Sequence, residues 1–593
     1  MKSAAGAVVL AGAVIASLPA FAQTRAPAFT VRGGPTLAAP LRPELMADLG
    51  TARRFAQAND YRTALPIYQM LLASDPTDVE LSIEVARVLG FADRNAESAA
   101  LYRRVVTTAP ARRTELLDSL AWQTLWGGDA AAAEPLFVEV AGLPVSATLR
   151  ASAWRGAAEA RQTLGRLEDS LRAYDAAIAL APDDRALLRR RAQMLLWLDR
   201  HAESIAAYEA LAASDPTDRL TQVGLAQALN FSGRHRQALA TWHAAGAPVG
   251  AEESREVARG LAWAGFPDMA YATLQDATLP DAVFLRDWRV RREVRPAAWA
   301  ALEWSRDRDR LDTRALTLGT QLRLASARTV EFAWRRFDLS EPAGAARGDR
   351  LSAGYAWRFG DPYARGGALW PSVTVAANQY PGWAPITGAA RLRWVPRDLL
   401  RIDAEWARET IETATALANR VTVTTASLAA DWRPTPRWSA GGSTALLRFD
   451  DGNLRARITG RADYALRFSP KVVLGLEGQA FRSSDPTDAA RPGRGYWNPR
   501  SYQEARAYAG VFHDFQPWEF QGRVGLGISR EVDGFGASGS GTPNVWELAL
   551  ARDLGPGWRA RLYAGGSGSS FGTASGGTGY WRRFAGAAIT GWW

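Results

Sequence analysis

Cysteine is absent from the 593 residues, and histidine occurs only 4 times. The first absence excludes disulfide frameworks, thiolate nucleophiles, Cys-ligated zinc or iron–sulfur sites and a lipid-modified N-terminal Cys. The scarcity of histidine argues against a His-based metal or acid–base centre. Lysine is confined to Lys2 and Lys471, so nearly all cations are arginine. We therefore expect no metal, no cofactor and no enzymatic activity.

A second absence concerns long hydrophobic runs. No stretch of about 20 apolar residues follows residue 22, so the sequence predicts no membrane-spanning helix. The chain begins with the basic Lys2 and an apolar run, and Ala20-Phe21-Ala22 then gives the small-x-small pattern of a cleavage site. We interpret residues 1–22 as a secretory signal peptide, cleaved between Ala22 and Gln23, rather than an uncleaved anchor. Residues 23–42 are expected to be a loose linker.

Charge is distributed unevenly between the two halves of the chain. The 71 Lys and Arg and 61 Asp and Glu give a net charge of +10, and residues 295–593 hold 39 of the cations and 28 of the anions. The whole positive excess therefore lies in the C-terminal half. A basic region can indicate nucleic-acid binding, but export across a membrane argues against nucleic acid as a partner.

Residues 43–290 carry an internal repeat. Proline recurs with a period near 34, which is typical of tetratricopeptide helix pairs, at Pro76, Pro110, Pro144, Pro182, Pro216, Pro248 and Pro280. Small residues and tyrosine follow the same period, because small side chains let paired helices approach and an aromatic ring fills the gap between pairs. We expect about seven repeats stacked in an α-solenoid. The residues expected to pack between helices are Ala52, Tyr68, Ala86, Tyr102, Trp154, Tyr174 and Tyr208.

Residues 295–593 alternate between apolar and polar side chains instead. Leu316, Leu318 and Leu322 share one face of an extended segment whose other face carries Gln321 and Arg323. About sixteen such segments follow one another, short Pro-containing turns alternate with longer Gly-rich loops, and tryptophans lie near segment ends. These features predict an antiparallel transmembrane β-barrel of about 16 strands. A periplasmic all-β domain is the alternative interpretation.

The polar faces of these segments would line the lumen of the barrel. Asp403 and Glu405 are expected to form ion pairs with Arg391 and Arg393, although two carboxylates on one strand face could also suit acid–base chemistry. One segment carries four arginines and would form the most positive stripe, which favours an anionic or neutral solute. The candidate lumen or polymer contacts are Arg323, Arg391, Arg393, Arg455, Arg457, Arg461, Arg467, Arg523, Arg559, Arg561, Asp403 and Glu405.

Together, a signal peptide, a tetratricopeptide solenoid and a C-terminal barrel resemble the layout of the exopolysaccharide export porins. That family includes the cellulose synthase outer-membrane subunit and the poly-N-acetylglucosamine export porin. The stretch from Tyr496 to Tyr502 also looks like an aromatic-x-Ser-Pro-x-x-Tyr stretch of such barrels, with Asn498 in place of serine. The resemblance implies an outer-membrane porin that exports a polysaccharide during biofilm formation.

The resemblance also implies partners. The periplasmic repeats would dock periplasmic or inner-membrane glycan synthase or glycan-modifying proteins, or guide the polymer, while the barrel contacts outer-membrane lipid. A non-transporting outer-membrane scaffold, or a phage or surface receptor, is the alternative function, because the same layout serves either role.

Overall fold

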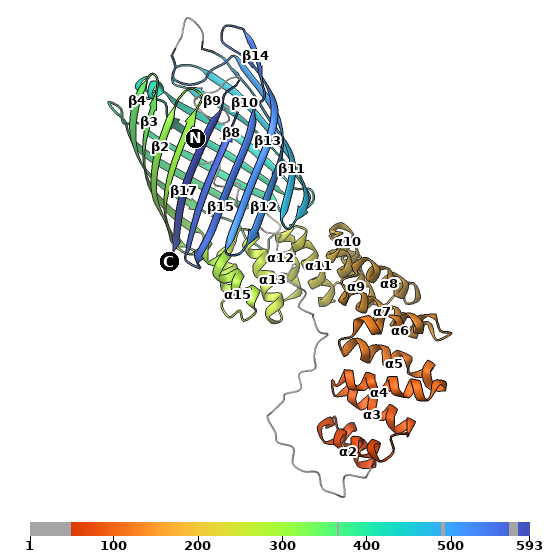
Figure 1. The fold of residues 1–593 in the computed structure, drawn as a ribbon. Helices are drawn as coiled ribbons and strands as arrows, with labels where there is room; N and C mark the ends of the chain where they lie inside the picture. The colour runs from red at the N-terminus through yellow and green to blue at the C-terminus, as the bar shows by residue number, and fades with distance from the viewer. Residues whose placement is uncertain (1–48, 365–366, 488–492, 569–578) are drawn as a thin grey trace. The chain divides into compact units, whose positions relative to one another are not determined.

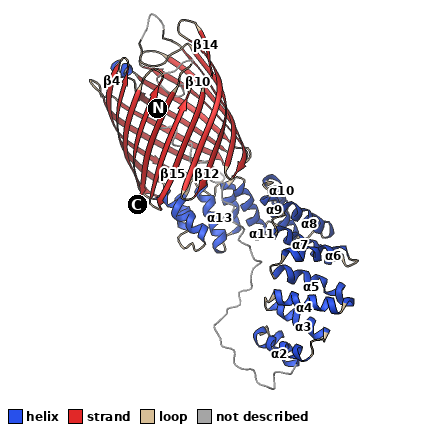
Figure 2. Ribbon diagram, in the orientation of Figure 1, coloured by secondary structure: helices blue, strands red, loops and turns tan. Residues whose placement is uncertain are grey.

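The computed structural model describes residues 49–364, 367–487, 493–568 and 579–593 (Figure 1). The predicted signal peptide 1–22, its cleavage site at Ala22 and Gln23, and the linker 23–42 lie outside these residues. The described chain divides into two compact units, with the boundary between Ala228 and Leu229. The first unit is helical, and the second contains further helices and every strand (Figure 2).

The helices of the first unit follow one another as antiparallel pairs joined by short turns, so the predicted solenoid of helical repeats is confirmed. They are α1 (Leu49–Gln57), α2 (Tyr61–Ser74), α3 (Val79–Phe91), α4 (Asn95–Thr108), η3 (Pro110–Arg112), α5 (Arg113–Trp126), α6 (Ala130–Gly142), α7 (Ala147–Thr163), α8 (Leu167–Leu180), α9 (Arg185–Trp197), α10 (His201–Ser214) and α11 (Arg219–Phe231).

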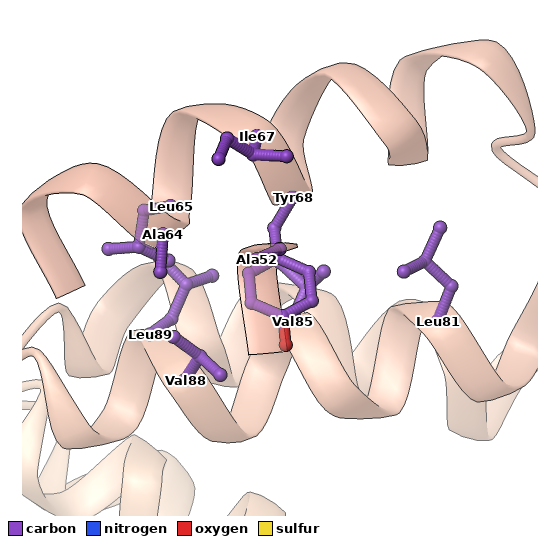
Figure 3. Close-up of a cluster of buried hydrophobic side chains, with 9 residues drawn as sticks. All are labelled: Ala52, Ala64, Leu65, Ile67, Tyr68, Leu81, Val85, Val88 and Leu89. Carbon is purple, nitrogen blue, oxygen red and sulfur yellow. The ribbon is translucent and has the colours of Figure 1, made fainter. Parts of the chain in front are cut away.

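The small residues of the repeat let neighbouring helices approach. Ala52 and Ala86 are fully buried, and Tyr68 fills the space among α1, α2 and α3 (Figure 3). Tyr102, Tyr174 and Tyr208 are buried at equivalent places in later repeats, while Trp154 is partly buried against the cluster around Tyr174. Apolar burial between successive helices therefore stabilises the stack.

A recurring hydroxyl bond accompanies this packing. Ser98, Ser170 and Ser204 each donate a hydrogen bond to the backbone carbonyl of an alanine twelve residues earlier, at 2.6, 2.8 and 2.8 Å. The bond joins the two helices of a pair at the place where they lie closest. It also satisfies the buried hydroxyl, which would otherwise be costly in an apolar contact.

The second unit ends in a closed barrel. Its strands are β1 (Ala297–Asp307), β2 (Asp312–Ala325), β3 (Arg328–Glu341), β4 (Gly344–Trp357), β5 (Ala368–Gln379), β6 (Ile386–Arg397), β7 (Leu400–Thr410), β8 (Thr422–Trp432), β9 (Trp438–Phe449), β10 (Leu454–Phe468), β11 (Lys471–Ser483), β12 (Ser501–Phe515), β13 (Trp518–Val532), β14 (Ser538–Gly541), β15 (Asn544–Gly555), β16 (Trp558–Ser567) and β17 (Arg582–Trp592). All neighbours pair antiparallel, and β1 pairs with both β2 and β17, which closes the sheet. The short β14 only extends β13, so the predicted barrel of 16 strands is confirmed.

The outer face of the barrel is apolar. Leu446, Ile458 and Leu526 are 53%, 61% and 71% exposed, although each lies within a strand of the wall. Large exposed apolar surfaces on a soluble protein are rare, and on a closed barrel they match the band that contacts lipid. No helix among the described residues is long and apolar enough to cross a membrane.

Helices α12 (His235–Ala245), α13 (Gly250–Trp263), α14 (Pro267–Thr273), α15 (Pro280–Phe284), η4 (Leu285–Val290) and α16 (Arg291–Val294) lie at one end of the barrel. Asp398, in the turn between β6 and β7, accepts hydrogen bonds from the backbone N–H groups of Arg236 and Gln237 at the start of α12, at 3.0 and 3.2 Å. Burial raises the pKa of Asp398, and these two donors oppose the rise. Arg358 forms an ion pair with Asp268 at 2.8 Å. We call the end of the barrel that carries α12 to α16 the helix end and the opposite end the loop end.

Two equivalent tyrosines allow a matched test of repeat packing. Tyr68 and Tyr174 are 1% and 0% exposed. The Tyr68 hydroxyl donates to Glu84 at 2.7 Å, whereas the Tyr174 hydroxyl has no hydrogen-bond partner among the described residues. In a fragment spanning 43–234, which keeps α11 whole, Tyr68→Phe should lower the free energy of unfolding by about 1–2 kcal/mol. Tyr174→Phe should leave it unchanged or raise it. Urea unfolding, followed by the circular dichroism of the helices, measures both free energies of unfolding. Equal losses of stability in the two variants would contradict the difference in hydrogen bonding between the two tyrosines.

The barrel lumen and its lid

The predicted ion pairs between β6 and β7 are present. Arg391 lies opposite Glu405 and Arg393 opposite Asp403 in the register of the two strands. The paired atoms are 2.9 and 2.8 Å apart. These carboxylates are thus held by arginines of the adjacent strand, which argues against the acid–base interpretation for them. The role of these residues in contacting a polymer stays a prediction.

Further around the wall, single carboxylates are shared between two arginines. Asp431 on β8 accepts from Arg401 on β7 and from Arg461 on β10, two strands away. Glu477 on β11 forms ion pairs with Arg506 and Arg523 in the same way. Each carboxylate therefore bridges strands that are not hydrogen-bonded to each other by their backbones. Such networks stabilise long side chains in one geometry better than isolated pairs do.

The remaining predicted residues occupy separate parts of the wall. Arg559 pairs with Glu519 at 2.5 Å, and Arg561 lies over the ring of Tyr563 at 5.6 Å. Arg323 lies at the helix end, where it donates to the backbone carbonyl of Glu293 on α16. The predicted set therefore extends over most of the barrel circumference instead of forming one compact centre. Within the described ranges, no three His, Asp or Glu side chains converge in a way that could hold a metal ion.

The arginines of β10 do not form one uniform stripe. Arg455 donates to the carbonyl of Trp497 at 2.6 Å and lies over the rings of Phe449 and Phe481. Arg461 is neutralised by Asp431. Arg457, between them, has no carboxylate within ion-pair distance among the described residues. The positive charge of this strand is therefore concentrated near its loop end.

Arg467 differs from the other arginines of β10. A β-bulge between Ala465 and Arg467 shifts the register, so that Arg467 lies opposite Val472. Opposed residues of an antiparallel pair share a face, and Val472 shares its face with the exposed Leu474. The Arg467 side chain therefore projects from the outer face at the helix end and not into the lumen. The alternation of residues in the sequence could not show the orientation of Arg467, because a bulge reverses the face on which the following residues lie.

A short helix covers part of the lumen at the loop end. Helix α17 (Ala414–Ala418) lies in the connection between β7 and β8. Its Leu417 packs in a buried cluster with Phe337, Leu339 and Tyr380. Its Ala416 packs in a second cluster with lumen-facing side chains of β8 and β9. We call residues 411–421 and 493–498 together the lid, because the helix joins walls that are several strands apart.

The second half of the lid comes from the connection between β11 and β12. Thr413 donates to the carbonyl of Gly495 at 2.6 Å, and Asn419 donates to the carbonyl of Gly493 at 3.1 Å. Tyr496 stacks on Phe449 with ring centroids 4.3 Å apart and donates to Asp451 at 2.8 Å. The stretch from Tyr496 to Tyr502, which looks like a stretch of the export porins, thus begins in the lid.

The lid has only a weak signature in the sequence. Thr413 caps α17 by accepting from the N–H of Ala416, and an alanine-rich run follows it. A capping residue before a run of helix formers is a readable helix start. The five-residue length of α17 made it indistinguishable from a loop, and its position over the lumen depends on strands far away in sequence.

Comparison with known proteins gives distant structural likenesses. No family model matches the chain, and no curated protein matches it. A solved structure described as a bacterial polysaccharide outer membrane secretin is 14% identical, with a TM-score of 0.40, and the match covers 51% of this chain and 99% of that one. A tetratricopeptide repeat protein from Parabacteroides merdae is 12% identical, with a TM-score of 0.34, over 39% of this chain and 90% of that one. Likenesses of this size assign no ligand or activity to the chain.

Two glycines of the lid allow a matched pair of substitutions that tests whether the lid limits conductance. Gly493 and Gly495 both have positive φ, 76° and 83°. A Cβ at Gly495 would lie 2.3 Å from the backbone nitrogen of Ala416, whereas nothing lies within 4 Å at Gly493. Gly495→Ala should therefore displace α17 and raise single-channel conductance in planar bilayers. Gly493→Ala carries the same backbone cost and should keep the wild-type conductance. Unchanged conductance in both variants would mean that the lid does not limit the pore.

Because of the bulge, two arginines of β10 lie on opposite faces of the barrel wall, which allows a matched test of ion selectivity. Arg457→Gln removes a lumen charge without a carboxylate partner, so it should lower the anion preference of the channel. Arg467→Gln removes the same charge from the outer face of the same strand and should leave the preference unchanged. Reversal potentials across a salt gradient measure both effects. A wild-type channel that prefers cations would contradict the prediction that the electrostatic potential in the lumen is positive.

Proposed function

We propose that this chain is an outer-membrane channel through which a polysaccharide leaves the cell. The observation that carries the proposal is the lumen wall, where arginines and carboxylates form a hydrogen-bonding surface along strand after strand of a closed barrel. A barrel of this strand number encloses an interior wide enough for water and solute. A hydroxyl-rich polymer can exchange hydrogen bonds with such a wall at each step of its movement, without a single tight site to hold it.

The charge of the lumen supports a neutral or anionic polymer over a cationic one. Most lumen charges are compensated within the shared networks, so the wall presents polar groups with little net field. The region around Arg455 and Arg457 keeps positive charge near the lid. A cationic polymer would be repelled there, while hydroxyl or carboxylate groups would find donors.

The helical repeats are proposed to dock periplasmic or inner-membrane glycan synthase or modifying proteins, or to guide the polymer. Two aromatic side chains support a contact role, because Phe91 and Trp126 are 61% and 55% exposed at the ends of α3 and α5. Each lies two residues before the residue with positive φ that turns the chain, Asp93 and Gly128. Exposed rings at equivalent repeat positions give a regularly spaced surface for a ligand.

The lid favours a second candidate function. A barrel whose loop end is covered by packed apolar clusters could serve as a scaffold or surface receptor without transporting anything. The two functions differ in whether the lid must move. Export requires the α17 clusters to separate, whereas a receptor keeps them intact.

A reversible lock on the lid separates these functions in cells. The chain has no cysteine, so a Leu339→Cys, Leu417→Cys double variant is designed to place a single disulfide between the lid and β3, two segments that meet in one buried cluster. Loss of free thiol on oxidation shows that the disulfide has formed. Extracellular polysaccharide should fall to the level of cells lacking the protein, and a membrane-impermeant reductant should restore it. The single-cysteine variants are the controls. Secretion that continues with the lid locked would rule out passage through the lumen and favour the scaffold or receptor.

A further inference from the structure

A belt of arginines surrounds the loop end of the barrel on its outer face. Its members are exposed, and each lies on the outward-facing side of its strand by the alternation of the strand. They are Arg306, Arg314, Arg336, Arg347, Arg408, Arg448, Arg482, Arg530 and Arg583. None of these arginines belongs to the predicted lumen set, and the proposed export route does not use them.

The orientation of the belt follows from strand alternation. Arg306 shares its face with Trp304, Arg448 with Leu446 and Arg530 with Ile528, which are 39%, 53% and 71% exposed. Side chains two apart on a strand project to the same side. The belt therefore faces the surroundings of the barrel and not its interior.

The height of the belt matches the far boundary of the apolar band. On β9, Trp438 lies near the helix end and Arg448 near the loop end, ten residues apart. At a rise of about 3.4 Å per residue and a tilt near 45°, they are separated by roughly 24 Å along the barrel axis. That distance is the height of the lipid-facing band, so the arginine head groups lie at the level of lipid headgroups.

The two ends of the barrel differ in chemistry. Exposed tryptophans surround the helix end, with Trp394, Trp432, Trp438 and Trp558 on four strands. Arginine is much rarer on the outer face there, and Arg552 lies over the ring of Trp518. Aromatic side chains suit any membrane interface, whereas a belt of guanidinium groups specifies anions.

Carboxylates neutralise only part of the belt. Arg314, Arg336, Arg347 and Arg408 have ion pairs with Asp312, Asp349, Asp338 and Asp450 at 3.6, 3.4, 2.5 and 3.2 Å. Over the described residues, no such pair involves Arg306, Arg448, Arg482, Arg530 or Arg583. The belt therefore keeps an excess of positive charge on the outer face.

Two of the arginines without an ion pair among the described residues lie opposite each other where β1 pairs with β17. Arg306 lies directly opposite Arg583 in the pairing that closes the barrel. Like charges directly opposite each other on neighbouring strands destabilise a sheet. A bound anion that accepts hydrogen bonds from both guanidinium groups would reverse this repulsion, and phosphate oxygens match the guanidinium geometry.

We infer that this belt binds the phosphate groups of an anionic lipid in the membrane leaflet at the loop end, with Arg306 and Arg583 forming its principal site. The lipid carries phosphate without a compensating amine, because a zwitterionic headgroup would neutralise its own phosphate and gain little from a second guanidinium. A membrane lipid is favoured over free phosphate, since the belt lies at headgroup height beside an apolar band that acyl chains cover. The inference rests on the membrane insertion that the proposed function includes.

The test compares two pairs of outward arginines in the purified full-length protein. The probe is an acylated glucosamine disaccharide bisphosphate in detergent, and its dephosphorylated form is the lipid control. Arg306→Gln with Arg583→Gln should weaken binding of the bisphosphate about tenfold or more, measured by native mass spectrometry. Arg328, at the helix end of β3, shares its outward face with the exposed Phe332. Arg328→Gln with Arg552→Gln therefore removes two outward arginines at the helix end and should leave the affinity unchanged. The dephosphorylated lipid should not distinguish these variants.

Equal affinities of the two double variants for the bisphosphate would overturn the inference, as would wild-type binding that ignores the lipid phosphates. Migration of unheated protein in electrophoresis shows that each variant is a folded barrel. Failure here leaves the export proposal intact, because the locked-lid experiment measures secretion and not lipid affinity. Conversely, secretion through a locked lid would end the export proposal while phosphate-dependent lipid binding still stood.

Discussion

Pairing of the last strand with the first is the interaction on which the rest of the barrel depends. Once β17 and β1 are joined, each of the 16 strands of the wall has two hydrogen-bonded neighbours, and the described part of the wall has no open edge. Closure also fixes the register, and a shift of one residue would exchange the two faces of a strand. The polar lumen and the apolar exterior are therefore two results of one constraint, and so is the opposition of Arg306 and Arg583.

Inside the barrel, the dominant effect is compensation of charge across strands. Asp431 and Glu477 each hold two arginines, one on the adjacent strand and one on a strand that the backbone does not pair with their own. The field in the lumen is consequently smaller than the number of arginines suggests. Its strongest positive part lies beside the lid, where Arg457 has no described carboxylate partner. A wall of compensated charges combines solubility for a polymer with weak local binding, which suits movement better than capture.

Different interactions hold the two ends of the lumen together. At the loop end, α17 and the turn at Gly495 close over the lumen with apolar clusters and a few buried hydrogen bonds. At the helix end, charged contacts hold α12 to α16 against the strand turns, as Asp398 does when it caps α12. In the proposed export function, the contacts of the lid must break for a polymer to pass. The proposed route for a polymer therefore has its movable part at the loop end.

The sequence by itself determined the two kinds of architecture, the number of strands, the buried tyrosines of the repeats and the pairing of Arg391 with Glu405. These features depend on periods of two or about 34 residues, or on adjacent strands, so local spacing is sufficient to predict them. Only the tertiary structure decided that a bulge turns Arg467 outward, that Asp431 serves two arginines and that α17 covers the lumen. In each case the deciding contact joins segments whose register or approach is fixed by barrel closure, and no local pattern in the sequence records it.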